Sequence, residues 1–363
     1  MKIAIDAREY STSTGRYIQK LLQYLAYTKS EHQFIVLLKP QDMDKFKIDD
    51  KRFKAIECPY KEFTWGEQLG FKQQLDDLKV DLVHFGMTQQ PVRYKGKTIT
   101  TIHDLTTLRF YNPDKNKLVF GVKQKVYAQV IKRVAKKSSI IITPSEYVKN
   151  DLVKFSNVSP KKVLVTYEAA DQIADSPDPL TNLQKSKFIM YVGRPTPHKN
   201  IEGLIDSFTA LQSKHPELKL VLVGKKDANY KRIEKSVQKR NITGVVFTGF
   251  TSESQLRWLY ENTAAYVFPS LSEGFGLPGL EAMVHGAPVV SSNATCLPEI
   301  YGDAAQYFNP KNTSSMTEAI DSVLSNEDLS KKLIKNGYLQ AKKYSWQQMA
   351  DQTLEIYNSL LED

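Results

Sequence analysis

Two glutamates flank a glycine-rich stretch in the segment SLSEGFGLPGLEAM, residues 270–283. Glu273 lies in a loop that would precede a helix, and Glu281 lies one turn into that helix. Gly274 and Gly276 would let the backbone approach a ligand closely, and Pro278 suits a first helical turn, where its missing N–H has no cost. The unpaired N–H groups and the dipole of such a helix start attract anions. The segment therefore predicts a ligand with an anionic middle, whose hydroxyl groups donate hydrogen bonds to the two carboxylates.

A pair of cations lies in a second loop, VGRPTPHKN, residues 192–200. Arg194 and Lys199 follow an expected strand and precede a helix that begins near Asn200. A guanidinium fork and an ammonium point charge together suit a diphosphate. Each charge taken alone also has an ordinary structural explanation; Glu281, for example, could simply stabilise the helix dipole. The two loops together predict a site for a nucleoside diphosphate sugar.

The elements that must position these loops are short apolar runs separated by helical patterns. Continuous apolar runs of about five residues are typical of strands buried on both faces of a parallel sheet. Their alternation with helices predicts an α/β protein with two doubly wound, Rossmann-like domains. Ligands of such sheets bind beyond the carboxyl ends of the strands, so we expect the two sheets to face each other across a cleft. The expected strands are KIAIDA, QFIVLLK, DLVHFG, TITTIHD, SIIITPS, KVLVTYEA, KFIMYVG, KLVLVG, GVVFTGF, AAYVFPS and APVVSS.

The boundary between the domains is expected in EAADQIADSPDPLTNLQKS, residues 168–186, which has little apolar periodicity and two closely spaced prolines. We predict an N-terminal domain over residues 1–170, a linker over 171–186 and a C-terminal domain over 187–344. The linker would act as the hinge between the two domains.

The composition of the 363 residues is that of an ordinary globular protein, with 41% hydrophobic and 25% charged residues. Two cysteines, Cys58 and Cys296, cannot form a disulfide framework, which favours a reducing cytosol. The N-terminal residues MKIAIDAREY contain no apolar signal-type core, and no apolar run is long enough to span a bilayer. We therefore expect a soluble, cytoplasmic protein.

In these motifs the sequence resembles the retaining glycosyltransferases of family 4, which have the GT-B fold. The family's Glu-x7-Glu signature corresponds to Glu273-GFGLPGL-Glu281, and its Arg/Lys pair corresponds to Arg194 and Lys199. The histidine of the family's N-terminal domain corresponds to His103 in TTIHDLTTLRFYNP, and IITPSEYVKNDL is also similar to the family. The likeness extends over nearly the whole chain, and several motifs in the same order are more specific than any one of them.

The resemblance implies a role for each of these side chains. Arg194 and Lys199 would hold the donor diphosphate and stabilise the charge that develops on it. Glu281 would bind the ribose hydroxyls, and Glu273 would contact hydroxyls of the transferred sugar. His103, from the domain that binds the acceptor, would approach the sugar ring.

The resemblance also implies contacts through the backbone. The segment Gly249-Phe250 would meet the base, and the final helix, 345–363, would cross back onto the N-terminal domain. Gly15 would lie near the donor phosphates, although STSTGRY holds one glycine where the family often has two. Another departure is Glu168-Ala169-Ala170-Asp171, where the family often has Asn-Gly-Val-Asp. The N–H groups expected at the transferred sugar belong to Phe275, Gly276 and Leu277.

The expected reaction needs neither a metal nor another cofactor. Departure of a nucleoside diphosphate creates negative charge that preorganised cations and helix N–H groups can stabilise. No Asp-x-Asp metal motif is present; Asp49-Asp50 and Asp76-Asp77 lie in polar segments typical of solvated surface. We therefore predict a transferase that retains the anomeric configuration, with the acceptor hydroxyl entering on the face of the leaving group.

Three alternatives remain open from the sequence. A GT-B sugar-nucleotide epimerase would share the fold and the donor. A nicotinamide oxidoreductase would need Gly-x-Gly-x-x-Gly after a strand, and GFGLPG has that spacing, but it lies late in the chain and between the paired glutamates. A non-catalytic nucleotide-binding or nucleic-acid-binding protein would account for basic charge, but no module of stacking aromatics and basic residues is present, so no nucleic acid partner is expected.

The net charge of +10 is unevenly distributed. Residues 1–170 hold 30 Lys and Arg against 18 Asp and Glu, or +12, whereas residues 171–363 hold 20 against 22, or −2. This asymmetry favours a glycan or lipid-linked acceptor that is anionic, or peripheral contact of the N-terminal half with an anionic membrane. A solvated basic surface is the simpler alternative.

One segment of the basic half, KNKLVFGVKQKVYAQVIKRVAKK, residues 115–137, is expected to form a helix. Its apolar stripe would comprise Leu118, Val122, Val126, Val130 and Val134. The lysines on an arc away from most of that stripe are Lys117, Lys125, Lys132 and Lys136. Such a helix could meet an anionic surface, or it could simply pack on the core with a solvated outer face.

Overall fold

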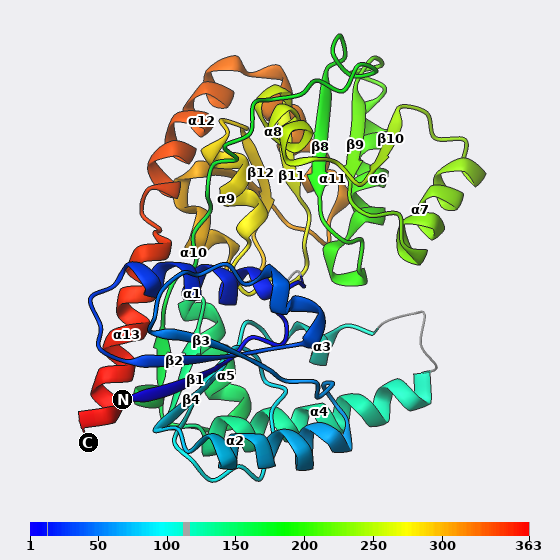
Figure 1. Ribbon diagram of the computed structural model, residues 1–363. Helices are drawn as coiled ribbons and strands as arrows, with labels where there is room; N and C mark the ends of the chain where they lie inside the picture. The colour runs from blue at the N-terminus through cyan, green and yellow to red at the C-terminus, as the bar shows by residue number, and fades with distance from the viewer. Residues whose placement is uncertain (13, 112–116, 363) are drawn as a thin grey trace. The chain divides into compact units, whose positions relative to one another are not determined.

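The protein is described by a computed structural model that covers residues 1–12, 14–111 and 117–362 (Figure 1). The chain divides into two compact units. The first comprises Met1–Arg109, Lys115–Glu168 and Ser345–Asp363, and the second comprises Phe110–Asp114 and Ala169–Tyr344. Each unit is built on one parallel sheet, which confirms the predicted α/β class with two Rossmann-like units.

The sheet of the first unit has seven strands in the order β3-β2-β1-β4-β5-β6-β7. All neighbouring strands are parallel, so their carboxyl ends lie along one edge. The central strands are buried on both faces because helices cover both sides of the sheet. The strands are β1 (Lys2–Asp6), β2 (Gln33–Leu38), β3 (Phe53–Glu57), β4 (Leu82–Phe85), β5 (Thr98–Thr101), β6 (Ile140–Thr143) and β7 (Val163–Val165).

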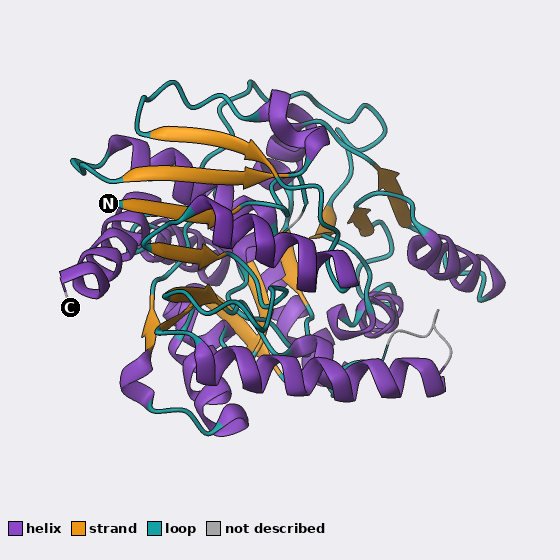
Figure 2. Cartoon of the chain, turned by 60° about the horizontal axis from the view of Figure 1, so that its bottom comes forward, coloured by secondary structure: helices purple, strands orange, loops and turns teal. Residues whose placement is uncertain are grey.

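The helices of the first unit include the last helix of the chain, α13 (Trp346–Glu362), which packs against α1 (Gly15–Tyr27). The hydroxyl of Tyr357 is 2.6 Å from Nδ1 of His84 in the buried strand β4. Figure 1 and Figure 2 show both chain ends on the same side of this unit. The other helical segments are η1 (Pro40–Lys45), η2 (Glu67–Phe71), α2 (Lys72–Leu78), α3 (Thr106–Arg109), α4 (Lys117–Lys137), α5 (Glu146–Ser156) and η3 (Pro160–Lys162).

Helix α4 forms where the sequence predicts it, but only part of the predicted apolar stripe is buried: Val134 is buried and Val130 is half-buried. Val122 and Val126 are 62% and 59% exposed. Besides Val134, the described side chains that α4 buries lie on a neighbouring stripe: Phe120, Ile131 and Ala135. The helix carries apolar residues on two stripes, and packing against the sheet selects the one with the large Phe and Ile side chains. The side chains of Lys117 and Leu118 lie outside the described residues.

The sheet of the second unit has six strands in the order β10-β9-β8-β11-β12-β13, again all parallel. The chain leaves β8 towards β9 on one side and later returns to β11 on the other side. The loops after β8 and β11 therefore diverge at the point where the strand order reverses, which is where ligands of such sheets bind. The strands are β8 (Phe188–Val192), β9 (Lys219–Val223), β10 (Val245–Gly249), β11 (Ala265–Phe268), β12 (Val289–Ser292) and β13 (Ala305–Phe308).

The helices of the second unit begin at side-chain caps in several places. Ser252 and Gln255 form a reciprocal capping box at the start of α8 (Glu253–Asn262), and Asp227 caps α7 (Ala228–Lys239). None of the helices in the described ranges of the chain is both long and apolar enough to cross a bilayer. The remaining segments are η4 (Pro197–Lys199), α6 (Ile201–Leu211), α9 (Leu277–Val284), α10 (Leu297–Tyr301), η5 (Gly302–Ala304), α11 (Thr313–Ser325) and α12 (Glu327–Ala341).

Two strands, β3 and β13, were missing from the sequence prediction. Both lie at an edge of their sheet. Their sequences, FKAIE and AQYF, interrupt the apolar run with polar residues. An edge strand is covered less completely than a central one, so it does not need the continuous apolar run that identifies a buried strand.

Candidate functional site

The structure brings together the two loops of the second unit that the sequence singled out. Lys199 ends η4 in the loop after β8, and Glu273 lies in the loop after the adjacent strand β11. The Lys199 Nζ atom is 2.6 Å from Glu273 Oε1 and lies 5.6 Å from the ring centroid of Phe268. The two side chains are 20% and 11% exposed, so this ion pair is partly desolvated and stronger than a surface pair.

The Glu273 backbone is held by residues that sequence reasoning missed. Its N–H donates to Thr295 Oγ1 at 3.0 Å, and its carbonyl oxygen accepts from Cys296 Sγ at 3.3 Å. Thr295 adopts a left-handed conformation with φ 55°, which is uncommon for a β-branched residue. The loop after β12 therefore fixes the position of the Glu273 loop, and only a pairing of distant segments could identify it.

The start of α9 is packed against Tyr301. Gly276 has φ 96°, and its carbonyl oxygen accepts a hydrogen bond of 2.5 Å from the Tyr301 hydroxyl. A Cβ atom on Gly276 would lie 2.5 Å from that hydroxyl oxygen, and a Cβ atom on Gly279 would lie 2.3 Å from the same ring. The glycines are thus needed for helix packing. As at any helix start, the N–H groups of Gly276 and Leu277 have no carbonyl acceptor within α9. The Phe275 side chain is buried, so a ligand could contact this residue only through its backbone.

Glu281 lies in the second turn of α9, where the Tyr260 hydroxyl donates to its Oε2 atom at 3.2 Å. His285 directly follows α9, and its Nδ1 atom lies 2.7 Å from the Glu281 carbonyl oxygen. The His285 Nε2 atom accepts the N–H of Ile173 at 3.0 Å, so Nδ1 carries the proton. Burial lowers the pKa of His285, in agreement with a neutral ring. The ring of Tyr260 stacks on the ring of His285, and this packing holds the hydroxyl group that bonds to Glu281.

Arg194 differs from Lys199 in its surroundings. Its side chain is 68% exposed, and its Nη2 atom lies 3.4 Å from Asp227 Oδ2. Asp227 also accepts the N–H groups of Asn229 and Tyr230 at the start of α7. The structure therefore places Arg194 in the same loop as Lys199 but does not join it to the Lys199–Glu273 pair.

Gly249 ends strand β10, and Phe250 follows it. Gly249 has φ 75°, a conformation that favours glycine, and the side chain of Phe250 is 87% exposed. An exposed phenyl ring at a strand end can stack on a flat base. Contact of this pair with the base stays a prediction of the family resemblance.

His103 belongs to the first unit, directly after β5. Its Nδ1 atom is 3.2 Å from Glu168 Oε1, its Nε2 atom is 3.1 Å from the Gly86 carbonyl oxygen, and Tyr17 packs edge-on against its ring. A carboxylate and a carbonyl oxygen both accept hydrogen bonds, so this setting favours a proton on each ring nitrogen. Burial opposes the positive charge of such a ring, but the hydrogen bond and the charge of Glu168 outweigh it and raise the pKa of His103.

In the sequence Glu168 stands out only as a departure from the family pattern. The structure shows that this departure supplies the partner of His103, with a side chain that is 8% exposed. Gly15, the other departure, begins α1, where a Cβ atom would lie 2.0 Å from the Glu9 carbonyl oxygen and 2.3 Å from that of Tyr10. Glycine is therefore needed at this position so that the start of α1 can pack closely against the loop that precedes it.

The second unit thus presents an ammonium group, a helix start and two carboxylates around the strand-order reversal of one sheet. The ammonium and the helix N–H groups suit a diphosphate, and the carboxylates suit hydroxyl groups of sugars. The Lys199–Glu273 pair is the centre of this arrangement, since it joins the cation of one loop to the anion of the other.

Two family models match consecutive parts of the chain. The model described as Glycosyltransferase Family 4 matches residues 14–172, and the model described as Glycosyl transferases group 1 matches residues 173–340. Together they extend through the candidate residues of both units.

Comparison with known proteins gives relatives in sequence and in structure. O-antigen chain mannosyltransferase B of Escherichia coli is 29% identical over 282 residues, which are 73% of this chain and 71% of that protein. Sucrose-phosphate synthase from Thermosynechococcus elongatus has a TM-score of 0.80 at 20% identity, covering 100% of this chain and 99% of that one. HepE of Anabaena in complex with UDP-glucose has a TM-score of 0.75 at 14% identity, covering 99% and 100%. The two structures share their fold with this chain.

Proposed function

Because this chain belongs to the family 4 glycosyltransferases, with the GT-B fold, we propose that it transfers a hexosyl group from a GDP- or UDP-linked sugar to a hydroxyl group of a glycan or lipid-linked acceptor. The observation that carries the proposal is the Lys199–Glu273 pair beside the start of α9. The process served would be assembly of a cell-surface polysaccharide or glycolipid.

The donor is proposed to bind to the second unit. Lys199 and Arg194 bind the diphosphate, and the N–H groups at the start of α9 add their partial positive charge. Glu281 accepts hydrogen bonds from the ribose hydroxyls, while Glu273 accepts them from the transferred sugar. Support comes from the partly desolvated setting of Lys199 and Glu273, in which each charge–ligand contact is stronger than it would be in water.

The proposed reaction retains the anomeric configuration and needs no metal. The bond between the anomeric carbon and the diphosphate oxygen breaks, and its electron pair leaves with the phosphate, where Lys199 stabilises the charge. The acceptor oxygen bonds to the anomeric carbon on the same face, and its proton passes to the departing phosphate oxygen. His103 is not proposed as the base, because Glu168 and the Gly86 carbonyl oxygen already occupy its two ring nitrogens; its contact with the sugar remains a prediction of the family resemblance.

The identity of the donor is proposed only as a class. The relative in Escherichia coli is named a mannosyltransferase, and the HepE structure contains UDP-glucose. A mannosyl donor would be linked to GDP and a glucosyl donor to UDP, so the two comparisons favour different bases. A cytoplasmic location, with peripheral contact at an anionic membrane, is part of the proposal because the N-terminal half is strongly basic.

The test begins with the rise in melting temperature that GDP-mannose, UDP-glucose and other nucleotide sugars cause. The donor that binds is then incubated with a glycan acceptor, and the anomeric configuration of the product is read by NMR. A new glycosidic bond with retained configuration supports the proposal. Conversion of the sugar nucleotide without transfer to an acceptor would favour the epimerase. Binding without any reaction would favour a non-catalytic nucleotide-binding protein.

A further inference from the structure

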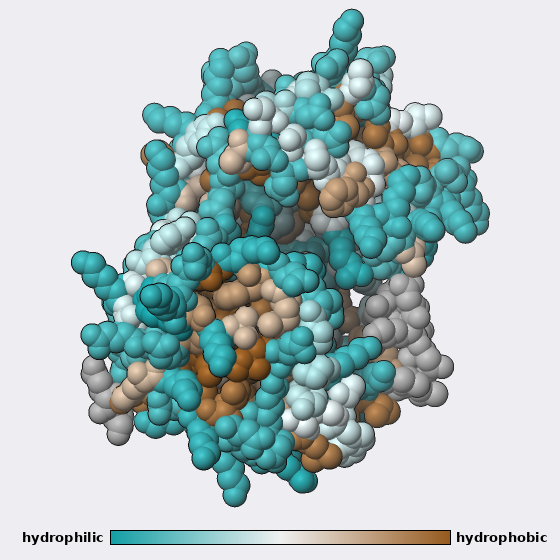
Figure 3. All heavy atoms as spheres, in the orientation of Figure 1, coloured by the Kyte–Doolittle hydropathy of each residue, from teal (hydrophilic) through white to brown (hydrophobic). Residues whose placement is uncertain are grey.

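The first unit exposes large apolar side chains on two neighbouring segments. Phe63, Trp65 and Leu69, in and around η2, are 70%, 81% and 62% exposed, and Val122 and Val126 of α4 are exposed to a similar degree. Figure 3 shows apolar atoms among hydrophilic ones along the lower right edge, where Figure 1 draws α4 and α2. Exposed apolar side chains that cluster in this way are typical of an interaction surface.

Hydrogen bonds and ring contacts join the two segments into one face. The ring of Phe63 lies edge-on against Tyr127 of α4, with 6.0 Å between ring centroids. The Gln68 side chain donates to the Gln90 carbonyl oxygen and accepts the N–H of Val92, each at 3.0 Å. The segment that contains Val92 is therefore bonded to η2 on one side and approaches α4 on the other.

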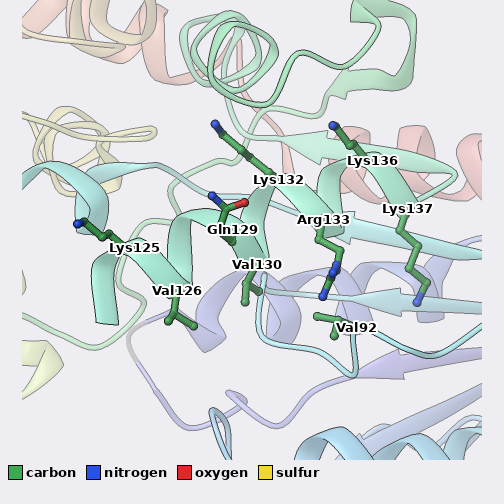
Figure 4. A pocket seen from close by; sticks show the side chains of 9 residues that line it. All are labelled: Val92, Lys125, Val126, Gln129, Val130, Lys132, Arg133, Lys136 and Lys137. Atoms are coloured by element: carbon green, nitrogen blue, oxygen red, sulfur yellow. The ribbon is translucent and has the colours of Figure 1, made fainter. Parts of the chain in front are cut away.

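A groove of about 860 Å³ lies between α4 and Val92. Figure 4 shows Val126, Val130, Arg133 and Lys137 on the side of α4 that faces Val92. The floor of the groove is thus apolar along one part and cationic along the other. This combination suits an amphiphile with an anionic head and a hydrocarbon tail better than a purely ionic ligand.

Lys137 strengthens the argument for an anion. Its Nζ atom is buried and has no hydrogen-bond partner among the described residues. It lies 5.5 Å from the ring centroid of Tyr94, and burial lowers its pKa to about 8. A buried ammonium without an acceptor is unfavourable, and a turn of the flexible Lys137 side chain into the groove that it lines would let a phosphate oxygen supply one.

The charge of α4 is entirely of one sign. Its sequence, KLVFGVKQKVYAQVIKRVAKK, contains seven Lys and Arg residues and no Asp or Glu. Figure 4 shows the side chains of Lys132 and Lys136 pointing in another direction than Arg133, and both also line the groove, so basic groups surround it on more than one side. A surface of negative charge, rather than one anion, is complementary to this distribution.

The loop that carries Phe63 and Trp65, residues 61–69, is held in place by a buried ion network. Phe63 has φ 62°, an unfavourable conformation for a bulky residue, and its N–H donates to Glu67 Oε2 at 3.2 Å. Glu67 Oε1 is 2.9 Å from Nη1 of Arg8, which is fully buried and also pairs with Asp6. The fold thus keeps the aromatic side chains of this loop exposed to solvent, although this requires a strained backbone and three buried charges. Such an arrangement indicates that the exposed side chains have a function.

We propose that a docking face, made of loop 61–69 and the groove between Val92 and α4, binds an anionic lipid bilayer, with Trp65 entering the interface and Arg133 and Lys137 binding a lipid phosphate. Aromatic side chains favour the interfacial region of bilayers, and basic residues are attracted to anionic headgroups. The proposal deepens the proposed function, on which it rests for the nature of the acceptor, by naming the residues that bring the enzyme to a lipid surface.

Tryptophan emission tests the proposal directly. The chain has three tryptophans, of which Trp258 and Trp346 are only 9% and 3% exposed. With vesicles of mixed phosphatidylcholine and phosphatidylglycerol, the emission of Trp65 should shift to shorter wavelength and be quenched by brominated lipid chains. Vesicles of phosphatidylcholine alone should cause neither change. An emission spectrum that anionic vesicles leave unaltered would overturn the proposal.

Co-sedimentation of variants with the anionic vesicles separates the apolar from the ionic contribution. Trp65→Ser should reduce binding and remove the blue shift, whereas Tyr27→Ser, at another exposed aromatic of the same unit (69% exposed), should do neither. Lys125→Gln and Arg133→Gln, both at exposed positions, should each weaken binding about fivefold, the equivalent of about 1 kcal/mol per charge. Lys51→Gln, at another exposed lysine, is their matched control.

The controls also keep this proposal distinct from the proposed function. All of these variants should bind nucleoside diphosphate and transfer sugar to a water-soluble acceptor as the wild type does. Equal losses in the Tyr27 and Trp65 variants, or equal binding to neutral and anionic vesicles, would refute the docking face and leave the transferase assignment intact. Binding that depends on the same residues but is specific for an acidic protein or a nucleic acid would refute the lipid partner.

Discussion

Replacing Glu273 with Gln should have opposite effects on donor turnover and on binding of the product nucleotide. The amide keeps an oxygen that can accept a hydrogen bond from Lys199, so the fold should survive. Transfer should slow by about 10²-fold or more, as expected for the loss of a contact that matters in the transition state. Binding of UDP or GDP without the sugar should instead become tighter, because the Glu273 carboxylate opposes the charge of the phosphate and neutralises part of the charge of Lys199.

The size of the second effect follows from the geometry. Lys199 Nζ is 2.6 Å from Glu273 Oε1. A phosphate oxygen bound at about 2.8 Å on the opposite side of Nζ would be at most about 5.4 Å from that carboxylate oxygen. Two unit charges at this separation repel by about 0.8 kcal/mol in water and by about 3 kcal/mol at an effective permittivity of about 20. Solvent at the edge of the site favours a value of about 1 kcal/mol, which is a fivefold gain in affinity.

Isothermal titration calorimetry with UDP and GDP measures the affinity, and a radiolabelled donor measures the turnover. Glu327→Gln provides the control, because Glu327 pairs with Lys331 on the same unit while its side chain remains 80% exposed. That variant should match the wild type in both assays. Weaker nucleotide binding in Glu273→Gln would show that the carboxylate does not face the phosphate, and unaltered turnover would remove its role in transfer.

Three further predictions concern the diphosphate, the metal and the histidine. Arg194→Ala and Lys199→Ala should each weaken calorimetric binding of UDP or GDP by about 10- to 150-fold, since each removes a charge-assisted hydrogen bond of about 1.5–3 kcal/mol; unchanged affinity in both would move the phosphate site elsewhere. Transfer should persist in excess EDTA, and complete loss that Mg²⁺ or Mn²⁺ restores would reject the metal-independent mechanism. Glu168→Gln should lower the pKa of His103, measured by NMR titration of the imidazole, because the carboxylate raises it in the wild type. Because the pKa of His103 is higher in the folded than in the unfolded protein, its ion pair stabilises the wild type at acidic pH, and this stabilisation is lost as the pH rises through the folded-state pKa. The Tm of Glu168→Gln should therefore fall further below that of the wild type at about pH 5.5 than at about pH 9. A Tm difference that does not depend on pH would contradict the ion pair.

The amino-acid sequence by itself determined the class of fold and the identity of the two loops at the centre of the site. Continuous apolar runs identify strands buried on both faces wherever they occur, so the central strands of both sheets could be predicted. The loops of Lys199 and Glu273 could be expected at one edge because the carboxyl ends of parallel strands lie together. The edge strand β13 was missed because its polar residues break the apolar run.

Only the tertiary structure decided which distant residues support the site. Adjacency of β8 and β11 brings Lys199 within 2.6 Å of Glu273, and residues as far along the chain as Thr295 and Tyr301 then fix the surrounding backbone. None of these partners has a local sequence signal, since each depends on which strands become neighbours.

The partner of His103 and the exposed face of α4 likewise could not be predicted from the sequence, because both depend on how distant segments pack. Glu168 differs from the family pattern, and its pairing with His103 depends on where the chain leaves β7. Helix α4 carries two apolar stripes, and its periodicity alone cannot tell which one the core will cover. Packing of Ile131 against the sheet left Val122 and Val126 exposed, because a helix can bury only one face against one sheet.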